Sequence, residues 1–163
     1  MEKPLKTNVI AAAKVDETTI TDILENGAID FIDNGGLYVT GYPFNFWIDL
    51  DKTRKLLIIY SFWETMHDVN ELEMLRFGNE TSQNKVMLQF SYNAEYGRFY
   101  AYYTHPFSVG LLAPQVLKLC QKFSSIFDEV VKDGIAGGIL QDFPDCPCGD
   151  VTDEAAAADG TVH

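Results

Sequence analysis

The sequence predicts an α+β domain in which an antiparallel sheet of about five strands packs against three helices, in the chain order α-β-β-β-α-β-β-α. Three observations support this prediction. Apolar residues recur at helical spacing in three segments, apolar and polar residues alternate in strand-like runs between them, and glycine- or asparagine-containing turns separate the runs. We expect the domain to span residues 16–141, after a lead-in segment (1–15) and before an acidic, disordered tail (142–163).

The first helix pattern follows a group of capping residues. Residues 16–19 carry side chains that cap a helix N-terminus and an acidic charge that suits its first turn. Ile20, Ile23 and Leu24 then form an apolar stripe, and Gly27 is suited to end the helix. The pattern predicts a short helix whose stability depends on packing against the rest of the domain.

Strand-like runs fill the chain between this helix and the next helix pattern. A turn at residues 34–36 separates candidate strands at 28–33 and 37–40, and residues 44–49 alternate between apolar and polar side chains. Residues 55–63 are apolar at nearly every position. Such a strand is either covered on both faces or placed at a dimer contact.

The second helix pattern is expected to begin near Thr65 and Asp68 and to end at Gly78 and Asn79. Its imperfect apolar face consists of Met66, Val69, Leu72, Leu75 and Phe77. A polar connection then leads to a hairpin with candidate strands at 86–92 and 98–104. The second of these strands places three residues on one face, namely Arg98, Tyr100 and Tyr102.

The strongest helical stripe of the sequence comes last. Pro114 is tolerated in the first turn of this helix, and Asp133 and Gly134 are expected to end it. The stripe consists of Val116, Leu119, Cys120, Phe123, Ile126, Phe127 and Val130. Cys120 lies inside this stripe, which is typical of a cysteine that is buried as a small apolar residue.

The charge of the chain excludes some classes of partner. The formal net charge is -12, and half of it comes from six acidic residues at and after Asp142, where the sequence has no Lys or Arg. An acidic surface repels phosphate backbones, so we expect no nucleic-acid partner. No stretch approaches the roughly 20 apolar residues that span a bilayer, and the N-terminal apolar run is too short for a secretory signal. The expected location is the cytoplasm, with no membrane partner.

The sequence offers little for catalysis or for metal binding. His67 lies beside Glu64 and Asp68, the pattern of a general base oriented by a carboxylate, but an exposed helix N-terminus has the same composition. His105 precedes a proline and is interpreted as a turn residue. Cys146 and Cys148 have only His163 near them in sequence, fewer ligands than tetrahedral zinc requires. We therefore predict no enzymatic activity, no cofactor and no metal.

Residues 18–132 resemble the YbjN-like family, whose fold is similar to that of type III secretion chaperones. The resemblance rests on a short helix ending Glu25-Asn26-Gly27, strands at Gly36-Leu37-Tyr38-Val39, Phe46-Trp47-Ile48 and Leu56-Leu57-Ile58-Ile59, an acidic helix closing at Asn79, paired strands at Val86 and Arg98, and a long helix after Ser108-Val109. The family usually carries Asn-x-x-Asn near the end of the second helix, whereas here Arg76 stands at the first of these positions and Asn79 at the second. The resemblance implies the sheet topology and a chaperone-like role in binding extended segments of partner proteins, often as a homodimer.

The combined prediction is a non-enzymatic protein-binding domain, chaperone-like or regulatory. Contacts with a partner polypeptide are expected at Trp47, Trp63, Tyr100 and Tyr102, because Tyr and Trp combine apolar area with a polar tip, although core packing also explains such residues. A neighbouring edge strand could accept a partner segment by strand addition. The expected homodimer interface consists of Met66, Val69 and Leu72. The alternative is a small-molecule-sensing regulator with a pocket between sheet and helices.

Overall fold

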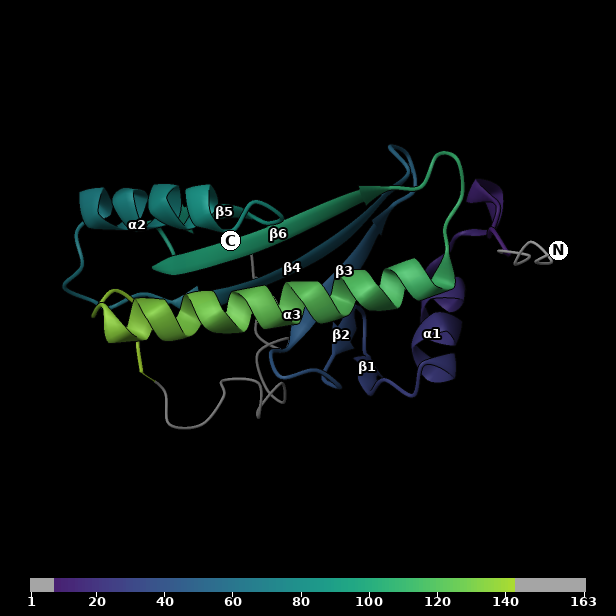
Figure 1. The fold of residues 1–163 in the computed structure, drawn as a ribbon, viewed down its shortest axis with the longest axis horizontal. Helices are drawn as coiled ribbons and strands as arrows, with labels where there is room; N and C mark the ends of the chain where they lie inside the picture. The colour runs from purple at the N-terminus through teal and green to yellow at the C-terminus, as the bar shows by residue number, and fades with distance from the viewer. Residues whose placement is uncertain (1–7, 143–163) are drawn as a thin grey trace, which may run out of the picture.

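The structure, a computed structural model, describes residues 8–142, which form a sheet and a layer of helices over one of its faces (Figure 1). The predicted α+β class is confirmed. The elements in chain order are η1 (Ala12–Lys14), α1 (Glu17–Asn26), β1 (Phe31–Asp33), β2 (Leu37–Val39), β3 (Phe46–Asp51), β4 (Leu56–Glu64), α2 (Glu71–Asn84), β5 (Gln89–Asn93), β6 (Arg98–Pro106) and α3 (Ala113–Ala136).

The sheet of the described residues has six strands in the order β1-β2-β3-β4-β6-β5, and every neighbouring pair is antiparallel. The predicted count of about five is therefore one too low. All four candidate runs before the second helix form separate strands, because β1 and β2, each only three residues long, pair with each other and extend the sheet beyond β3. The central pair, β4 and β6, is nine residues long.

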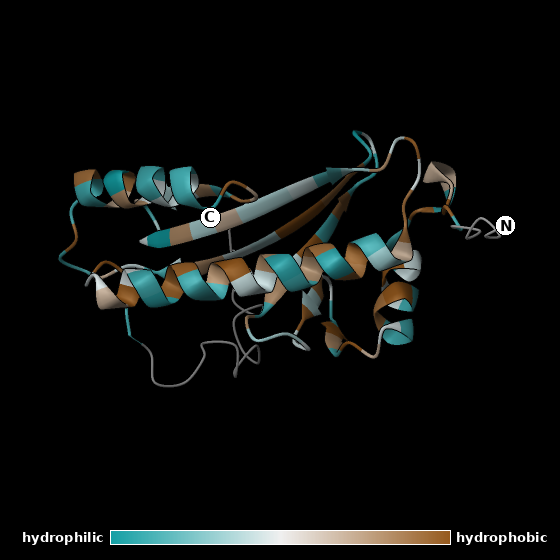
Figure 2. Cartoon of the chain, viewed as in Figure 1, coloured by the Kyte–Doolittle hydropathy of each residue, from teal (hydrophilic) through white to brown (hydrophobic). Residues whose placement is uncertain are grey.

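The long helix α3 buries its apolar stripe against the middle of the sheet. Hydrophobic and hydrophilic segments alternate along it in Figure 2, as its predicted stripe requires. The ring of Phe123 packs edge-on against Phe46 of β3, with centroids 5.4 Å apart, and Phe127 packs against Phe44 at 4.7 Å. The Ser124 hydroxyl, fully buried, accepts a hydrogen bond from the Phe44 amide and donates one to its carbonyl. These contacts fix α3 on one face of the sheet.

The lead-in and α1 pack beside the start of α3. Asp16 caps α1, as predicted, by accepting a hydrogen bond of 2.8 Å from the Thr19 amide. Ile10 forms an isolated bridge with Leu111, with backbone hydrogen bonds in both directions. The described part of the lead-in is therefore held against the domain.

The second helix begins later than predicted, at Glu71, and the prediction of a start near Thr65 is wrong. The Thr65 amide donates to the Gly97 carbonyl and the Met66 amide donates to Ile139, so this segment continues from β4 as extended chain. The helix starts only where Asn70 and Glu73 form a reciprocal capping box. It also continues through the predicted stop at Gly78 to Asn84.

The third helix likewise runs past its predicted end at Gly134, to Ala136. Gly134 is kept inside the helix by packing: a Cβ at this position would lie 2.5 Å from the side chain of Leu140. Leu140 itself is buried and bridges to Thr65, which closes the domain at the end of β4. The glycine is thus a site of close approach within the helix.

Candidate protein-binding surface

Alternate residues of β4 point to opposite sides of the sheet. Leu57, Ile59 and Trp63 are buried on the side of α3, whereas the residues between them are half-buried on the other side. The second helix packs on the side of α3 too, because Phe77 contacts the Phe99 ring at 5.1 Å. Among residues 8–142, all three α-helices lie on this first side (Figure 1). We call this side the covered face. We call the second side the open face.

One residue from each of the six strands forms a row across the open face. The strand register pairs Ile32 with Tyr38, Tyr38 with Trp47, Trp47 with Tyr60, Tyr60 with Tyr102, and Tyr102 with Gln89. The four central members are aromatic, and we call them the aromatic row: Tyr38, Trp47, Tyr60 and Tyr102. Ile32, at one end, is 51% exposed.

The rings of the aromatic row contact one another in sequence, with Trp47, Tyr60 and Tyr102 stacked and Tyr38 tilted against Trp47. Centroid distances are 4.5 Å from Tyr38 to Trp47, 5.7 Å from Trp47 to Tyr60 and 6.2 Å from Tyr60 to Tyr102. A second pair, Phe62 and Tyr100, lies alongside, and Phe62 is 4° from parallel with Trp47. Tyr38, at the end of the aromatic row, is only 6% exposed, whereas the other rings of this face are half-buried and contribute partly accessible apolar area.

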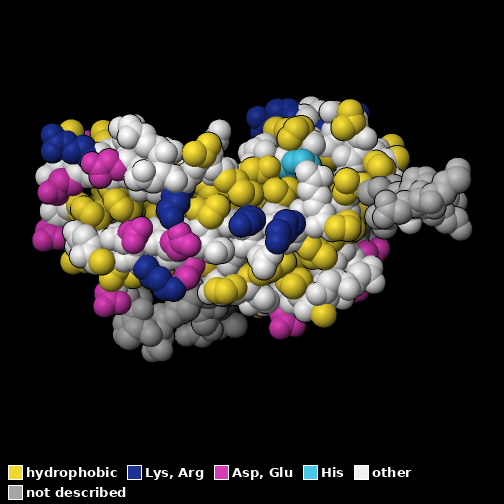
Figure 3. Space-filling view, in the orientation of Figure 1, with side chains coloured by type: hydrophobic (Ala, Val, Ile, Leu, Met, Phe, Trp, Pro, Cys, Tyr) yellow, Lys and Arg dark blue, Asp and Glu magenta, His cyan; other side chains and the backbone are white. Residues whose placement is uncertain are grey.

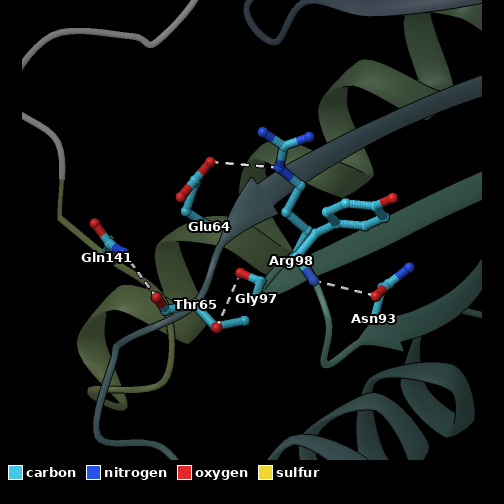
Figure 4. A network of polar contacts seen from close by, with 7 residues as sticks. Glu64, Thr65, Asn93, Gly97, Arg98 and Gln141 are labelled. Atoms are coloured by element: carbon cyan, nitrogen blue, oxygen red, sulfur yellow. Dashed lines mark hydrogen bonds and ion pairs between the residues drawn. The ribbon is translucent and has the colours of Figure 1, made fainter. Parts of the chain in front are cut away.

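Charged side chains flank these rings. At one end of the face Arg98 lies over the Phe62 ring, 4.3 Å from its centroid, and pairs with Glu64 at 3.4 Å. Figure 4 shows this pair beside Thr65, whose hydroxyl donates to the Gly97 carbonyl and whose own carbonyl accepts from Gln141. The network ties the ends of β4 and β6 to residue 141, near the end of the described chain.

The environment of the aromatic row also changes the acidity of its tyrosines. Burial raises the pKa of Tyr60, and the negative charge of Asp49 raises it further. Burial likewise raises the pKa of Tyr102. Both hydroxyls are therefore neutral donors and acceptors around neutral pH. They provide the polar tips of an otherwise apolar surface.

The strand at one edge of the sheet, β5, is open to pairing. It pairs only with β6 among the described strands, and its sequence Gln-Phe-Ser-Tyr-Asn has no charge and no proline. Natural edge strands are usually protected by charged residues, by proline or by being very short. The opposite edge strand, β1, has only three residues and ends in Asp33. The predicted edge suitable for strand addition is thus β5.

The structure brings three of the four predicted contact residues together. Trp47, Tyr100 and Tyr102 all lie on the open face, and Tyr100 and Tyr102 share the face of Arg98 as predicted. Trp63 is placed on the covered face instead. It is 6% exposed, packs against Phe44, and its indole nitrogen donates to the Gln141 carbonyl. We therefore leave Trp63 out of the candidate surface.

Sequence reasoning missed Tyr60 and Phe62, which are half-buried members of the surface, and Tyr38, which is buried at the end of the aromatic row. The run 55–63 is apolar on both faces, so its alternation gives no indication of which side carries aromatic rings. The available signal was that Tyr60 and Phe62 have the same parity, which places them on one side of a strand. Their proximity to Trp47 depends on the pairing of β3 with β4, and sequence pattern leaves this register open.

The predicted dimer interface lies around the start of α2. Met66 is 36% exposed, Val69 is half-buried, and both precede the helix. Leu72 and Leu75, on the outward side of α2, are 57% and 55% exposed. Leu72 and Leu75 thus form an exposed apolar patch on α2. The helix-bearing side of the molecule is otherwise a mixture of charged and apolar side chains, with apolar ones visible between α2 and α3 (Figure 3).

The remaining candidates for chemistry do not form a site within the part of the chain that the structure describes. His67 is exposed in the turn before α2, and His105 lies half-buried in β6 against the Tyr103 ring. No group of three or more metal-binding side chains is found between residues 8 and 142. None of the helices there combines the length and apolar character needed to cross a membrane. Cys146, Cys148, His163 and the predicted disordered tail after Asp142 lie outside the described residues.

Comparison with solved structures identifies the fold. The crystal structure of YbjN from E. coli, described as a candidate transcription regulator, matches with a TM-score of 0.69 and 11% sequence identity, covering 78% of this chain and 97% of that one. The chain has a YbjN-like fold. The predicted resemblance is thus confirmed at the level of fold. Arg76 and Asn79, at the positions of the family motif, are both exposed on α2 of this YbjN-like domain.

A second structural match is a chain of the HopA1–SchA chaperone–effector complex, with a TM-score of 0.46 and 15% identity, covering 70% of this chain and 96% of that one. No protein-family model matches the sequence, and no curated protein sequence matches it either.

Proposed function

We propose that this chain is a non-enzymatic, cytoplasmic protein-binding domain, chaperone-like or regulatory, that presents the open face of its sheet to an extended partner polypeptide. One observation carries the proposal: four contiguous aromatic rings, one from each of four adjacent strands, lie on a sheet face that no described helix covers, and three of them are only half-buried. Aromatic residues with polar tips are favoured at protein interfaces. The uncharged edge of β5 provides backbone groups for strand addition beside the same face.

The two tryptophans of the chain allow a direct test, because they lie on opposite faces of the sheet. In Trp63→Phe the remaining tryptophan, Trp47, reports on the open face. In Trp47→Phe the remaining Trp63 reports on the core. We expect a permanently unfolded polypeptide to shift the emission of Trp47 and leave that of Trp63 unchanged. Replacing Tyr100 and Tyr102 with Ala should weaken this binding at least tenfold, in the range of interface hot spots. Unchanged emission of Trp47 at saturating polypeptide would refute the proposal.

The proposed domain acts as a homodimer through Met66, Val69 and Leu72. The support is the exposed apolar patch at α2, since exposed leucines beside one another are typical of association surfaces. Light scattering of the full chain at several concentrations is expected to give twice the monomer mass, and Leu72→Glu is expected to return it to a monomer. Val86→Glu, at an 88% exposed position outside the patch, is the matched control. A wild-type monomer at all concentrations would exclude the homodimer.

A second candidate, a small-molecule-sensing regulator, is favoured by one cavity. A space of about 210 Å³ lies between α1 and the strands β2 and β3, lined on its apolar side by Ile20, Leu37, Ile48 and Leu50. A specific ligand stabilises the folded state by mass action, so a thermal-shift screen distinguishes this function from polypeptide binding. A hit that is lost in Ile48→Trp, which fills the cavity, would support the second candidate.

A further inference from the structure

We infer that the aromatic row, together with Asp49, binds arginine side chains of an extended cationic segment in the partner polypeptide. The inference rests on the proposed function and specifies the chemistry of the partner. Its starting point is an interaction that the chain makes with itself. The guanidinium of Arg98 lies over the Phe62 ring and pairs with the Glu64 carboxylate, so a cation, a ring and an acid already combine at one end of the open face.

In the middle of the open face, Trp47 and Tyr60 of the aromatic row provide the rings and Asp49 provides the acid. Asp49 lies two residues after Trp47 on the same face of β3, directly opposite Ile58 of β4. Its carboxylate is exposed and accepts a hydrogen bond of 2.8 Å from the adjacent Leu50 amide. Among residues 8–142, no Lys or Arg forms an ion pair with it. The effect of Asp49 on the pKa of Tyr60 indicates that the carboxylate acts on this ring system.

Two basic residues of the turn that follows β3 act on carboxylates other than Asp49. Arg54, in the turn between β3 and β4, pairs with Asp51 at 2.6 Å. Lys52, in the same turn, acts on the carboxylate of Asp16, the cap of α1, and lowers its pKa together with the larger effect of the Thr19 hydrogen bonds. Because Asp49 is exposed and takes part in none of the ion pairs among residues 8–142, its carboxylate is accessible to a cation from another chain.

Charge and shape both favour arginine as the occupant. The chain carries a formal charge of -12, which attracts a cationic segment and repels an acidic one. Trp47, Tyr60 and Tyr102 are only half-buried, and a planar guanidinium can stack on such a ring as Arg98 does on Phe62. Its remaining N–H groups can then reach the carboxylate in a paired hydrogen bond.

The test uses the full chain with Trp63→Phe, so that Trp47 reports binding. Three unstructured peptides of identical length and apolar content are titrated, carrying Arg, its neutral isostere citrulline, or Glu at alternate positions. We expect the Arg peptide to bind about tenfold more tightly than the citrulline peptide, and the Glu peptide to bind more weakly still. Asp49→Asn should reduce the ratio of the affinities for the Arg and citrulline peptides by about three- to tenfold. Glu25→Gln, which neutralises an exposed carboxylate on α1, should leave this ratio unchanged. Salt at about 0.5 M should reduce the preference, because it screens exposed charges.

The outcomes separate this inference from the proposed function. Equal binding of all three peptides, with no effect of Asp49→Asn, would overturn the arginine preference and leave polypeptide binding intact. No response of Trp47 to any peptide or to the unfolded polypeptide would overturn both. A preference for arginine that persists fully in Asp49→Asn would overturn the assignment of Asp49 as the cation's partner. Circular dichroism of each variant establishes that it is folded.

Discussion

The two faces of the sheet are built from the same strands but differ in how deeply their side chains are buried. On the covered face, Leu57, Ile59 and Phe99 are completely buried under the helices. On the open face, the same two strands carry Tyr60, Phe62, Tyr100 and Tyr102, which are only half-buried and contact one another. The difference shows that ring stacking across strands can partly replace a second helix layer. It leaves apolar area that is accessible to a partner.

The comparison predicts its largest effect at adjacent residues of β6 that point to opposite faces. Phe99→Ala, on the covered face, should lower the free energy of unfolding by about 3–5 kcal/mol, because it leaves a cavity beneath α2. Tyr100→Ala, on the open face, should cost about 1 kcal/mol, because solvent fills the space. Urea denaturation of both variants measures the difference. Equal losses would mean that the open face is packed as a second core.

A smaller effect is expected where the covered face contains a buried hydroxyl. Ser124→Ala removes the partner of both the amide and the carbonyl of Phe44 and should cost about 1–3 kcal/mol. Ser91→Ala, at an exposed position of β5 on the open face, should change stability by less than about 0.5 kcal/mol. Thermal unfolding followed by circular dichroism compares the two. A silent Ser124→Ala would show that water satisfies the Phe44 groups.

The helices of the covered face also depend on their caps. Asn70→Ala removes one half of the capping box of α2 and should cost about 1 kcal/mol. Because α2 covers Phe99 and Phe90 but not the aromatic row, the emission of Trp47 in the Trp63→Phe protein should not change. Denaturant titration and fluorescence of the same sample check both expectations. Altered emission of Trp47 would show that the two faces are coupled.

The smallest expected effect concerns pH. His105 lies half-buried in β6, opposite Leu57 of β4, and burial lowers its pKa from the ordinary value of 6.5. As the pH falls below 6.5, the unfolded chain takes up a proton before the folded one does, so this group reduces stability progressively down to its folded pKa. His105→Gln should therefore lose less stability than wild type between about pH 7 and about pH 5. The free energy of unfolding of the two proteins, measured by denaturant titration at each pH, tests this expectation. Parallel pH profiles of this free energy would contradict it.

Much of the fold follows from local pattern. The stripe of α3, the cap of α1 and the alternation in β6 all appear in the sequence because helix and strand periodicity places side chains on faces whatever the partner. The start of α2 was not predictable in this way. Thr65 and Met66 have helix-compatible neighbours, but their amides bond to Gly97 and Ile139, which are distant in sequence.

The candidate surface likewise contains some residues that local pattern predicts and others that depend on strand pairing. That Tyr100, Tyr102 and Arg98 share a face can be predicted from the sequence alone, since they are two residues apart on one strand. The presence of Trp47 and Tyr60 on this face, and the absence of Trp63 from it, follow from strand pairing and helix packing. Strand register and the side on which the helices pack are set by the whole core, and a shift of one residue exchanges the two faces.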